Sequence, residues 1–152
     1  EVFGVGVREL ERTQSEWPLP FHEVLKAMND SQHLERALGD LRESIRSPLD
    51  TGFFCYRAVE SVRQSFKKEE DKDRDGPSWE RMRNDLRIDR SWIDYLKTMA
   101  DEQRHGRTPY MSGEARVAAC QHAWKVVDRF CLFLHGGFVP LAVDRFAVLE
   151  QD

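Results

Sequence analysis

The fold of this chain is decided by residues 89–137, which read DRSWIDYLKTMADEQRHGRTPYMSGEARVAACQHAWKVVDRFCLFLHGG. In the first half of this stretch the apolar residues Trp92, Leu96 and Met99 recur every three or four positions. Residues at that spacing lie on one face of an α-helix and face a core. The first half therefore predicts a helix, with Asp89 as its N-cap.

The second half of the stretch predicts another helix, from Ser112 to His135. The Ser112 hydroxyl can accept a hydrogen bond from the backbone N–H groups of a first helical turn, and Gly136 with Gly137 provides a stop. A polar turn over residues 104–112 joins the two helices. We therefore expect two core-facing helices with a basic turn between them.

Three more helices are predicted upstream of residue 76. The first runs from Phe21 to Met28, and the second carries an apolar stripe at Leu34, Leu38, Leu41 and Ile45. Gly39 interrupts the second stripe and predicts a close packing contact. Ser47-Pro48-Leu49-Asp50 combines a capping hydroxyl, a proline at the first helical position and a carboxylate three residues after the cap. We expect the third helix to begin there and to bury Cys55, Val59, Val62 and Phe66.

Residues 67–76 read KKEEDKDRDG and contain no apolar side chain. Such a run is typical of a solvated helix end and a mobile loop. Asp71, Asp73 and Asp75 alternate as in a calcium loop, but the twelfth position of that motif is Met82 instead of the required glutamate. A solvated loop is the favoured interpretation. Ser78 then predicts the cap of a short helix that ends near residue 86.

These patterns predict an all-α protein, a helical bundle of four to six helices with short extended N- and C-terminal arms. We divide the chain into an extended arm over residues 1–20, the bundle over 21–137 and a C-terminal tail over 138–152. The tail is apolar from Phe138 to Val143, so it is expected to pack back on the bundle or to pair with the N-terminal arm.

Composition narrows the class of protein. The 152 residues are 40% hydrophobic and 33% charged, which suits one domain with a single core. A net charge of −4 excludes the overall basic field of a dedicated duplex binder and leaves a local basic patch open. Cys55, Cys120 and Cys131 are odd in number and lack CxxC spacing, so we predict small buried hydrophobes in a reducing, cytoplasmic compartment. Neither a signal peptide nor a membrane span is expected.

The turn at Arg104-His105-Gly106-Arg107 holds the candidate chemistry. A histidine exchanges a proton near neutral pH, and flanking arginines can hold a phosphate while negative charge grows on it. These groups suit cleavage of RNA without a metal. The structural alternative is that cations are favoured at the C-terminus of any helix, and by composition alone this alternative is favoured.

Three features of the chain resemble the HEPN superfamily of all-α domains over about residues 48–135. They are a helix that ends in Arg104-His105-Gly106, the long helix from Ala115-Arg116 to Trp124-Lys125-Val126-Val127-Asp128-Arg129-Phe130, and the earlier Tyr56-Arg57-Ala58-Val59-Glu60. The resemblance implies a helical bundle that pairs as a homodimer. Many members are metal-independent ribonucleases of toxin or defence systems, and others are inactive RNA-binding or assembly modules.

Active members of that superfamily carry an arginine followed after four to six residues by a histidine. His105 has no arginine at that distance upstream, whereas Arg116 with His122 and Arg129 with His135 match the spacing, about as often as composition alone predicts. On the resemblance, His105 is expected to transfer the proton, and Arg104 and Arg107 to hold the phosphate, with no cofactor or metal. The alternative is a non-catalytic helical interaction or dimerisation module that binds a protein partner.

Two further groups of side chains suggest a binding site, one aromatic and one polar. The aromatic residues Trp92, Trp124, Phe130, Phe133 and Phe138 could form a base-stacking platform, but their spacing favours core packing. His122, Lys125, Asp128 and Arg129 lie along one side of the last helix. They could contribute to a metal site, yet ordinary salt bridging is favoured because no HxxxH or ExxH spacing is present.

Overall fold

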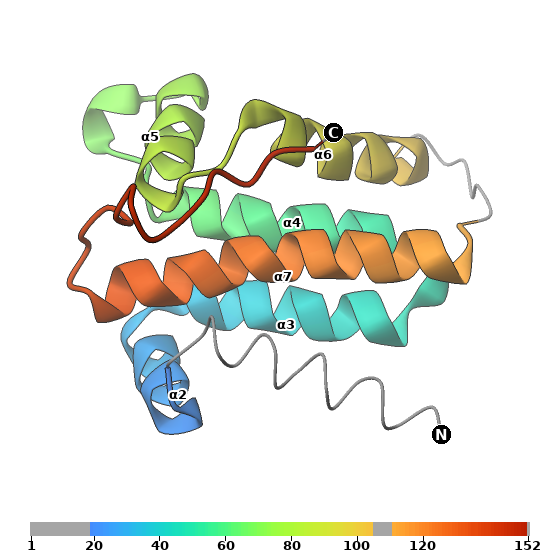
Figure 1. Cartoon of the computed structure of the whole chain (residues 1–152). Helices are drawn as coiled ribbons and strands as arrows, with labels where there is room; N and C mark the ends of the chain where they lie inside the picture. The colour runs from blue at the N-terminus through green and yellow to red at the C-terminus, as the bar shows by residue number, and fades with distance from the viewer. Residues whose placement is uncertain (1–18, 105–110, 152) are drawn as a thin grey trace.

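The computed structural model describes residues 19–104 and 111–151, with only the helical backbone at 102–104. These ranges contain six α-helices and no strand, which confirms the predicted all-α bundle (Figure 1). The helices are α2 (Phe21–Asp30), α3 (Gln32–Arg46), α4 (Thr51–Gln64), α5 (Gly76–Leu86), α6 (Arg90–Arg104) and α7 (Gly113–His135). Two short 3-10 helices, η1 (Pro48–Asp50) and η2 (Glu69–Asp71), precede α4 and α5.

The core lies where α3, α4 and α7 run side by side, with α5 and α6 packed along one edge and α2 at the other (Figure 1). Helix α4 is central, because it contacts α3, α6 and α7. Burying each large apolar side chain stabilises the fold by about 1.5–3 kcal/mol. Side chains that are at most 2% exposed come from five helices and include Leu41, Val59, Leu86, Leu96, Val126 and Phe130.

Helices α4 and α6 approach most closely at Gly52. A Cβ atom at Gly52 would lie 2.7 Å from the carbonyl oxygen of Met99, so only glycine fits at this crossing. The predicted close contact at Gly39 is wrong, because nothing lies within 4 Å of the position its Cβ would take. The sequence pattern of α3 pointed to Gly39, which has no close neighbour. The close contact is instead at Gly52, and its partner Met99 lies 47 residues further along the chain.

Two predicted N-caps are confirmed. The backbone N–H of Ser91 donates to Asp89 Oδ1 at 2.8 Å, and that of Ala115 donates to Ser112 Oγ at 3.1 Å. The capping box at Ser47 is wrong in detail, since the Ser47 side chain makes no capping bond and the α-helix begins at Thr51 after η1. Thr51 Oγ1 instead donates to the Ser44 carbonyl at 2.9 Å, which ties the start of α4 to the end of α3.

The apolar stripe of α3 is correct at three of its four positions. Leu34 and Leu41 are buried and Leu38 packs against the core, but Ile45 is 66% exposed. All four side chains that the third predicted helix was expected to bury are buried, although Phe66 lies two residues beyond the end of α4. The stripe of α6 also faces the core, with Trp92 and Leu96 among its buried side chains.

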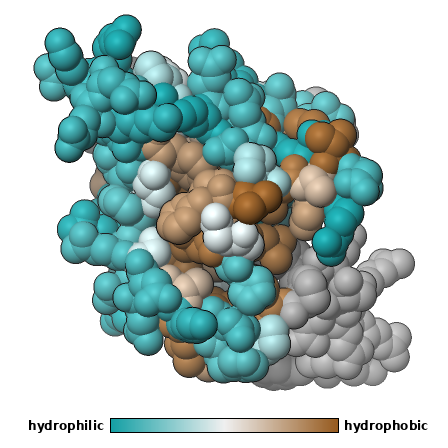
Figure 2. Space-filling model, turned by 90° about the vertical axis from the view of Figure 1, so that its left-hand side faces the viewer, coloured by the Kyte–Doolittle hydropathy of each residue, from teal (hydrophilic) through white to brown (hydrophobic). Residues whose placement is uncertain are grey.

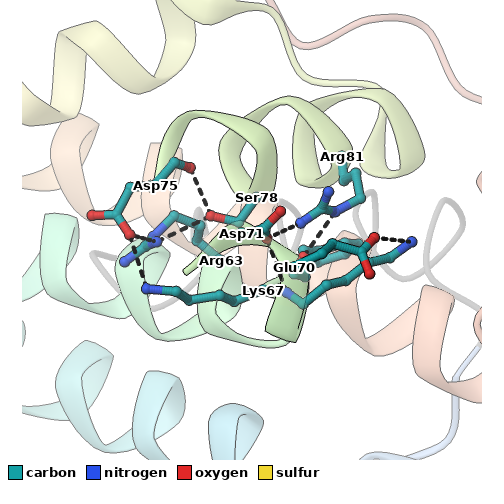
Figure 3. A network of polar contacts seen from close by, with 9 residues as sticks. Arg63, Lys67, Glu70, Asp71, Asp75, Ser78 and Arg81 are labelled. Carbon is teal, nitrogen blue, oxygen red and sulfur yellow. Dashed lines mark hydrogen bonds and ion pairs between the residues drawn. The ribbon is translucent and has the colours of Figure 1, made fainter. Parts of the chain in front are cut away.

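The charged segment, residues 67–75, is more ordered than its composition predicted. Asp71 is 2% exposed and pairs with Arg81, while Asp75 accepts a bond from Arg63 Nη1 at 2.7 Å (Figure 3). Arg81 Nε also donates to the Phe66 carbonyl at 2.9 Å. The predicted solvated character is confirmed, since every residue of the segment except Asp71 is exposed, but its composition did not predict that arginines of α4 and α5 bind two of its carboxylates.

The start of α5 differs from the prediction as well. The helix begins at Gly76, with Pro77 in its first turn, so Ser78 lies inside the helix rather than at its cap. The buried Ser78 hydroxyl accepts from Arg63 Nη1 at 3.0 Å and donates to the Asp75 carbonyl at 2.7 Å. Ser78 thus joins the network of the charged segment. No helix in the described part of the chain is long and apolar enough to cross a membrane.

Candidate functional site

The C-terminal segment, residues 136–151, runs back across α5 and α6 as an extended chain (Figure 1). The N–H of Leu141 donates to the Asp85 carbonyl at 2.8 Å. Further along, Leu149 forms an isolated parallel bridge with Ile88, and the N–H of Asp89 donates to the Leu149 carbonyl at 2.8 Å. Packing back on the bundle is thereby confirmed; the arm over residues 1–20 falls almost entirely outside the described residues.

Arg129 of α7 links this segment to the bundle through hydrogen bonds to backbone carbonyls. It is 7% exposed, and its guanidinium donates to the carbonyls of Leu86 at 3.0 Å, Arg87 at 2.6 Å and Ala147 at 2.7 Å. Burial lowers the pKa of Arg129 to about 10, with the positive charge of Arg87 as a second cause. The group stays protonated at neutral pH, so its charge is balanced by carbonyl dipoles from two separate stretches of chain.

The turn that leaves α7 has an unusual backbone. Gly137 has φ 75° and Phe138 has φ 64°, and the N–H of Phe138 donates to the Phe133 carbonyl at 2.9 Å. A left-handed conformation suits glycine but costs about 1–2 kcal/mol for a residue with a Cβ atom. The Phe138 ring contacts Phe133 edge-on at 5.6 Å between centroids, yet it remains 66% exposed.

Phe138, Val139 and Val143 are exposed apolar residues of the C-terminal segment, and we call them together the apolar end face. Their exposed fractions are 66%, 59% and 73%. In Figure 2, which views this end of the molecule, hydrophobic surface lies in the middle and is framed by hydrophilic side chains. Exposed apolar patches with a polar rim mark sites of association more often than isolated apolar residues do.

A groove of about 270 Å³ lies beside the apolar end face, between α2 and the end of α7. Phe138 and Leu134 form its apolar side, and its polar side carries both signs of charge from Glu23, Lys26 and Asp30. His135 also lines it, with Nδ1 3.6 Å from Glu23 Oε2. The groove and the apolar end face together are the candidate functional site.

Of the predicted catalytic group, the structure describes only the helical backbone of Arg104. Arg104 is the last residue of α6, and His105 and Arg107 lie outside the described residues. Their roles in proton transfer and phosphate binding are therefore still predictions. The C-terminal end of α6 lies near the start of α7, whereas the C-terminal segment begins at the other end of that helix (Figure 1).

Arg116 and His122, which have the spacing of active HEPN members, do not meet. Arg116 Nε donates to Thr51 Oγ1 at 3.0 Å, on the side of α4. His122 stacks on Trp92 with 3.9 Å between ring centroids, on the side of α6, and its ring nitrogens bond the Ala118 carbonyl and Gln151 Oε1. Both ring nitrogens thus have protein partners, which suits a structural histidine better than a proton carrier.

Arg129 and His135, the second pair with that spacing, also diverge. The guanidinium of Arg129 donates to backbone carbonyls, including those of Leu86 and Ala147, whereas His135 lies at the groove beside Glu23. Neither pair forms the paired site that acid–base cleavage of RNA requires. Within the described ranges, no group of three or more His, Cys, Asp or Glu side chains could hold a metal ion.

Comparison with known proteins adds a family without a described function. A family model described as the C-terminal domain of DUF8168, a domain of unknown function, matches residues 21–135. The chain belongs to this family. The match runs from the start of α2 to the end of α7. No curated protein and no solved structure matches the chain.

In this DUF8168 C-terminal domain, the aromatic residues divide into two groups. Trp92, Phe130 and Phe133 are buried as predicted, but core packing is wrong for Trp124, which is 47% exposed, and for Phe138. Helical spacing misplaced Phe138 because it lies beyond the end of α7, where the period no longer applies. The signal that could have found it is the Gly136-Gly137 pair, which indicates a left-handed turn directly before an aromatic residue.

Proposed function

We propose that this domain is a non-catalytic helical interaction module that pairs with a second copy of itself through the apolar end face. The observation that carries the proposal is Phe138, an exposed aromatic residue held in a left-handed backbone conformation. Strain of this kind persists where it positions a group for binding. Aromatic side chains are also enriched at the centres of protein interfaces.

The rim of the groove supports a second copy as the partner. A two-fold interface brings the same surface of each subunit together, so a surface that carries both signs of charge can pair with itself. Glu23 and Asp30 supply negative charge and Lys26 positive charge around the apolar side of the groove. The homodimer implied by the HEPN resemblance agrees with this arrangement, although pairing does not require any ribonuclease activity.

The test compares Phe138→Gly with the control Trp124→Ala by sedimentation velocity over a range of concentrations. Glycine removes the exposed ring and also relieves the backbone strain, so the variant is expected to fold and to be monomeric. Trp124 is a second exposed aromatic residue, 47% exposed on α7, and its loss should leave the dimer intact. A monomeric parent chain, or a dimer lost only in Trp124→Ala, would contradict the proposal.

Ribonuclease activity centred on His105 is tested separately. The full chain is incubated with a mixed single-stranded RNA pool in excess chelator, alongside His105→Ala and the control His22→Ala. His22 is a suitable control because its side chain is 75% exposed on α2. Chelator-resistant cleavage that only His105→Ala loses would assign catalysis to the turn. An inactive parent chain that binds no RNA would leave the interaction module as the function.

A further inference from the structure

Two cysteines that are 65 positions apart in sequence meet in the core. Cys55 of α4 and Cys120 of α7 lie with their sulfur atoms 3.9 Å apart. Cys55 is 0% exposed, while Cys120 is only partly buried. The two thiols thus form a pair in which one residue is partly exposed and the other is fully buried.

The surroundings of Cys120 favour its thiolate. The Cys55 thiol donates to Cys120 Sγ, Ser44 Oγ lies 3.5 Å from the same sulfur, and Arg116 is one helical turn before it. These groups lower the pKa of Cys120, with the bond from Cys55 as the largest cause and the charge of Arg116 contributing. The same bond, together with burial, raises the pKa of Cys55. Reactive cysteines are partly exposed thiolates near positive charge, as Cys120 is.

We propose that Cys120 is a peroxide-reactive thiolate and that Cys55 is its resolving thiol. In the first step the Cys120 thiolate attacks one oxygen of a hydroperoxide, the O–O bond breaks, and the leaving alkoxide or hydroxide takes up a proton from water. Cys120 is thereby oxidised to a sulfenic acid. In the second step Cys120 no longer carries the thiolate whose bond and charge raise the pKa of Cys55. The Cys55 thiol then gives up its proton as its sulfur attacks Cys120 Sγ, the S–O bond breaks, and the hydroxide leaves with that proton as water. The product is a Cys55–Cys120 disulfide.

The geometry suits the second step. The sulfurs need to approach by only about 1.9 Å, from 3.9 Å to the roughly 2.05 Å of a disulfide. The bond would join α4 to α7, the two helices at the centre of the bundle. Because both sulfurs come from one chain, resolution requires no second molecule.

Cys131 provides an internal comparison on the same helix as Cys120. It is 4% exposed, and burial raises its pKa to about 12. A thiol of that kind is a poor nucleophile at neutral pH. Peroxide should therefore oxidise Cys120 and leave Cys131, eleven positions further along α7, reduced.

The test uses the full reduced chain, treated with one equivalent of hydrogen peroxide at neutral pH and analysed by peptide mass spectrometry. We expect a Cys55–Cys120 disulfide within one chain, with Cys131 still able to react with iodoacetamide after denaturation. In Cys55→Ser the sulfenic acid cannot be resolved, so a dimedone adduct should accumulate on Cys120. Cys120→Ser should form neither product, and Cys131→Ser should behave like the parent chain.

Other outcomes would overturn the proposal. They are equal oxidation of all three cysteines, disulfides only between chains, or a Cys55→Ser variant without an adduct on Cys120. If Cys55→Ser does not fold, Cys55→Ala serves in its place. Arg116 acts as a positioning residue here, so Arg116→Gln should slow alkylation of Cys120 at neutral pH several-fold, and Arg116→Lys should restore part of the rate.

Discussion

The charged segment and the C-terminal segment both lack a helical period, and arginines anchor both to the bundle by different means. Arg63 and Arg81 bind carboxylates of the charged segment, Asp75 and Asp71 (Figure 3). Arg129 instead binds backbone carbonyls, including that of Ala147. Carboxylates can be protonated and carbonyls cannot, so the first anchor should respond to acid and the second should not. Substituting the arginines of each anchor, and lowering the pH, should therefore affect the two segments differently.

The largest effect is expected from Arg129→Met. The change removes bonds to three carbonyls and leaves the buried carbonyl of Leu86 without this partner, which should lower the free energy of unfolding by about 3–5 kcal/mol. Chemical denaturation measures the loss, and hydrogen exchange at the Asp89 amide, which donates to the Leu149 carbonyl, reports release of the C-terminal segment. The control Arg90→Met removes a largely exposed pair with Asp94 and should cost at most about 0.5 kcal/mol. Equal effects of the two variants would refute the assigned role of Arg129.

A smaller and more local effect is expected from Arg63→Met. Its buried guanidinium bonds Asp75 and Ser78, so the substitution should loosen the charged segment and leave the C-terminal segment in place. Limited proteolysis measures this as faster cleavage within residues 67–75. Faster cleavage within residues 136–151 instead would show that the two segments are not independent.

Acid should separate the two anchors without any mutation. The Arg63 guanidinium holds the pKa of Asp75 below its ordinary value of 3.8, and the Lys68 backbone N–H, followed by Arg81, does the same for Asp71. A carboxyl group with a lowered pKa in the folded state stabilises the fold above pH 3.8, and this contribution is lost as the pH falls through the lowered value. Hydrogen exchange at pH 5 and pH 2 should show the charged segment opening first, because Arg129 keeps its charge and its carbonyl partners throughout. Earlier opening of the C-terminal segment would contradict the idea that only the carboxylate anchors respond to acid.

The smallest effect concerns backbone strain, which both segments contain. Lys72 in the charged segment has φ 51° and Phe138 in the C-terminal segment has φ 64°. Lys72→Gly should raise the free energy of unfolding by up to about 1 kcal/mol, because the exposed lysine loses little. Phe138→Gly should give no net gain, since it also loses the ring contact with Phe133. Thermal unfolding compares the two variants at a concentration at which both are monomeric, and a similar gain in both would mean that the Phe138 ring contributes nothing to the fold.

Much of the fold could be predicted from the sequence where the determining interactions are local. The stripes of α4 and α6 and the caps at Asp89 and Ser112 all depend on residues within one or two turns. Prediction failed where a distant partner decides the outcome. The sequence did not show that Asp71 and Asp75 of the charged segment are paired, because their arginine partners lie outside it, on other helices.

The candidate site was less predictable for the same reason. The exposed position of Phe138 depends on how α7 ends and on where the C-terminal segment is anchored. The meeting of Cys55 with Cys120 depends on the packing of α4 against α7, so spacing alone classed both as inert core residues. The predicted role of His105 remains untested.

The sequence by itself determined that this protein is a helical bundle, where most of its helices lie and which faces of them are apolar, because helical period and capping are properties of short stretches of chain. Only the tertiary structure decided which glycine allows a close crossing, which arginine becomes an anchor and which aromatic ring remains exposed. Those outcomes depend on contacts between residues distant in sequence, and such contacts exist only once the helices have packed.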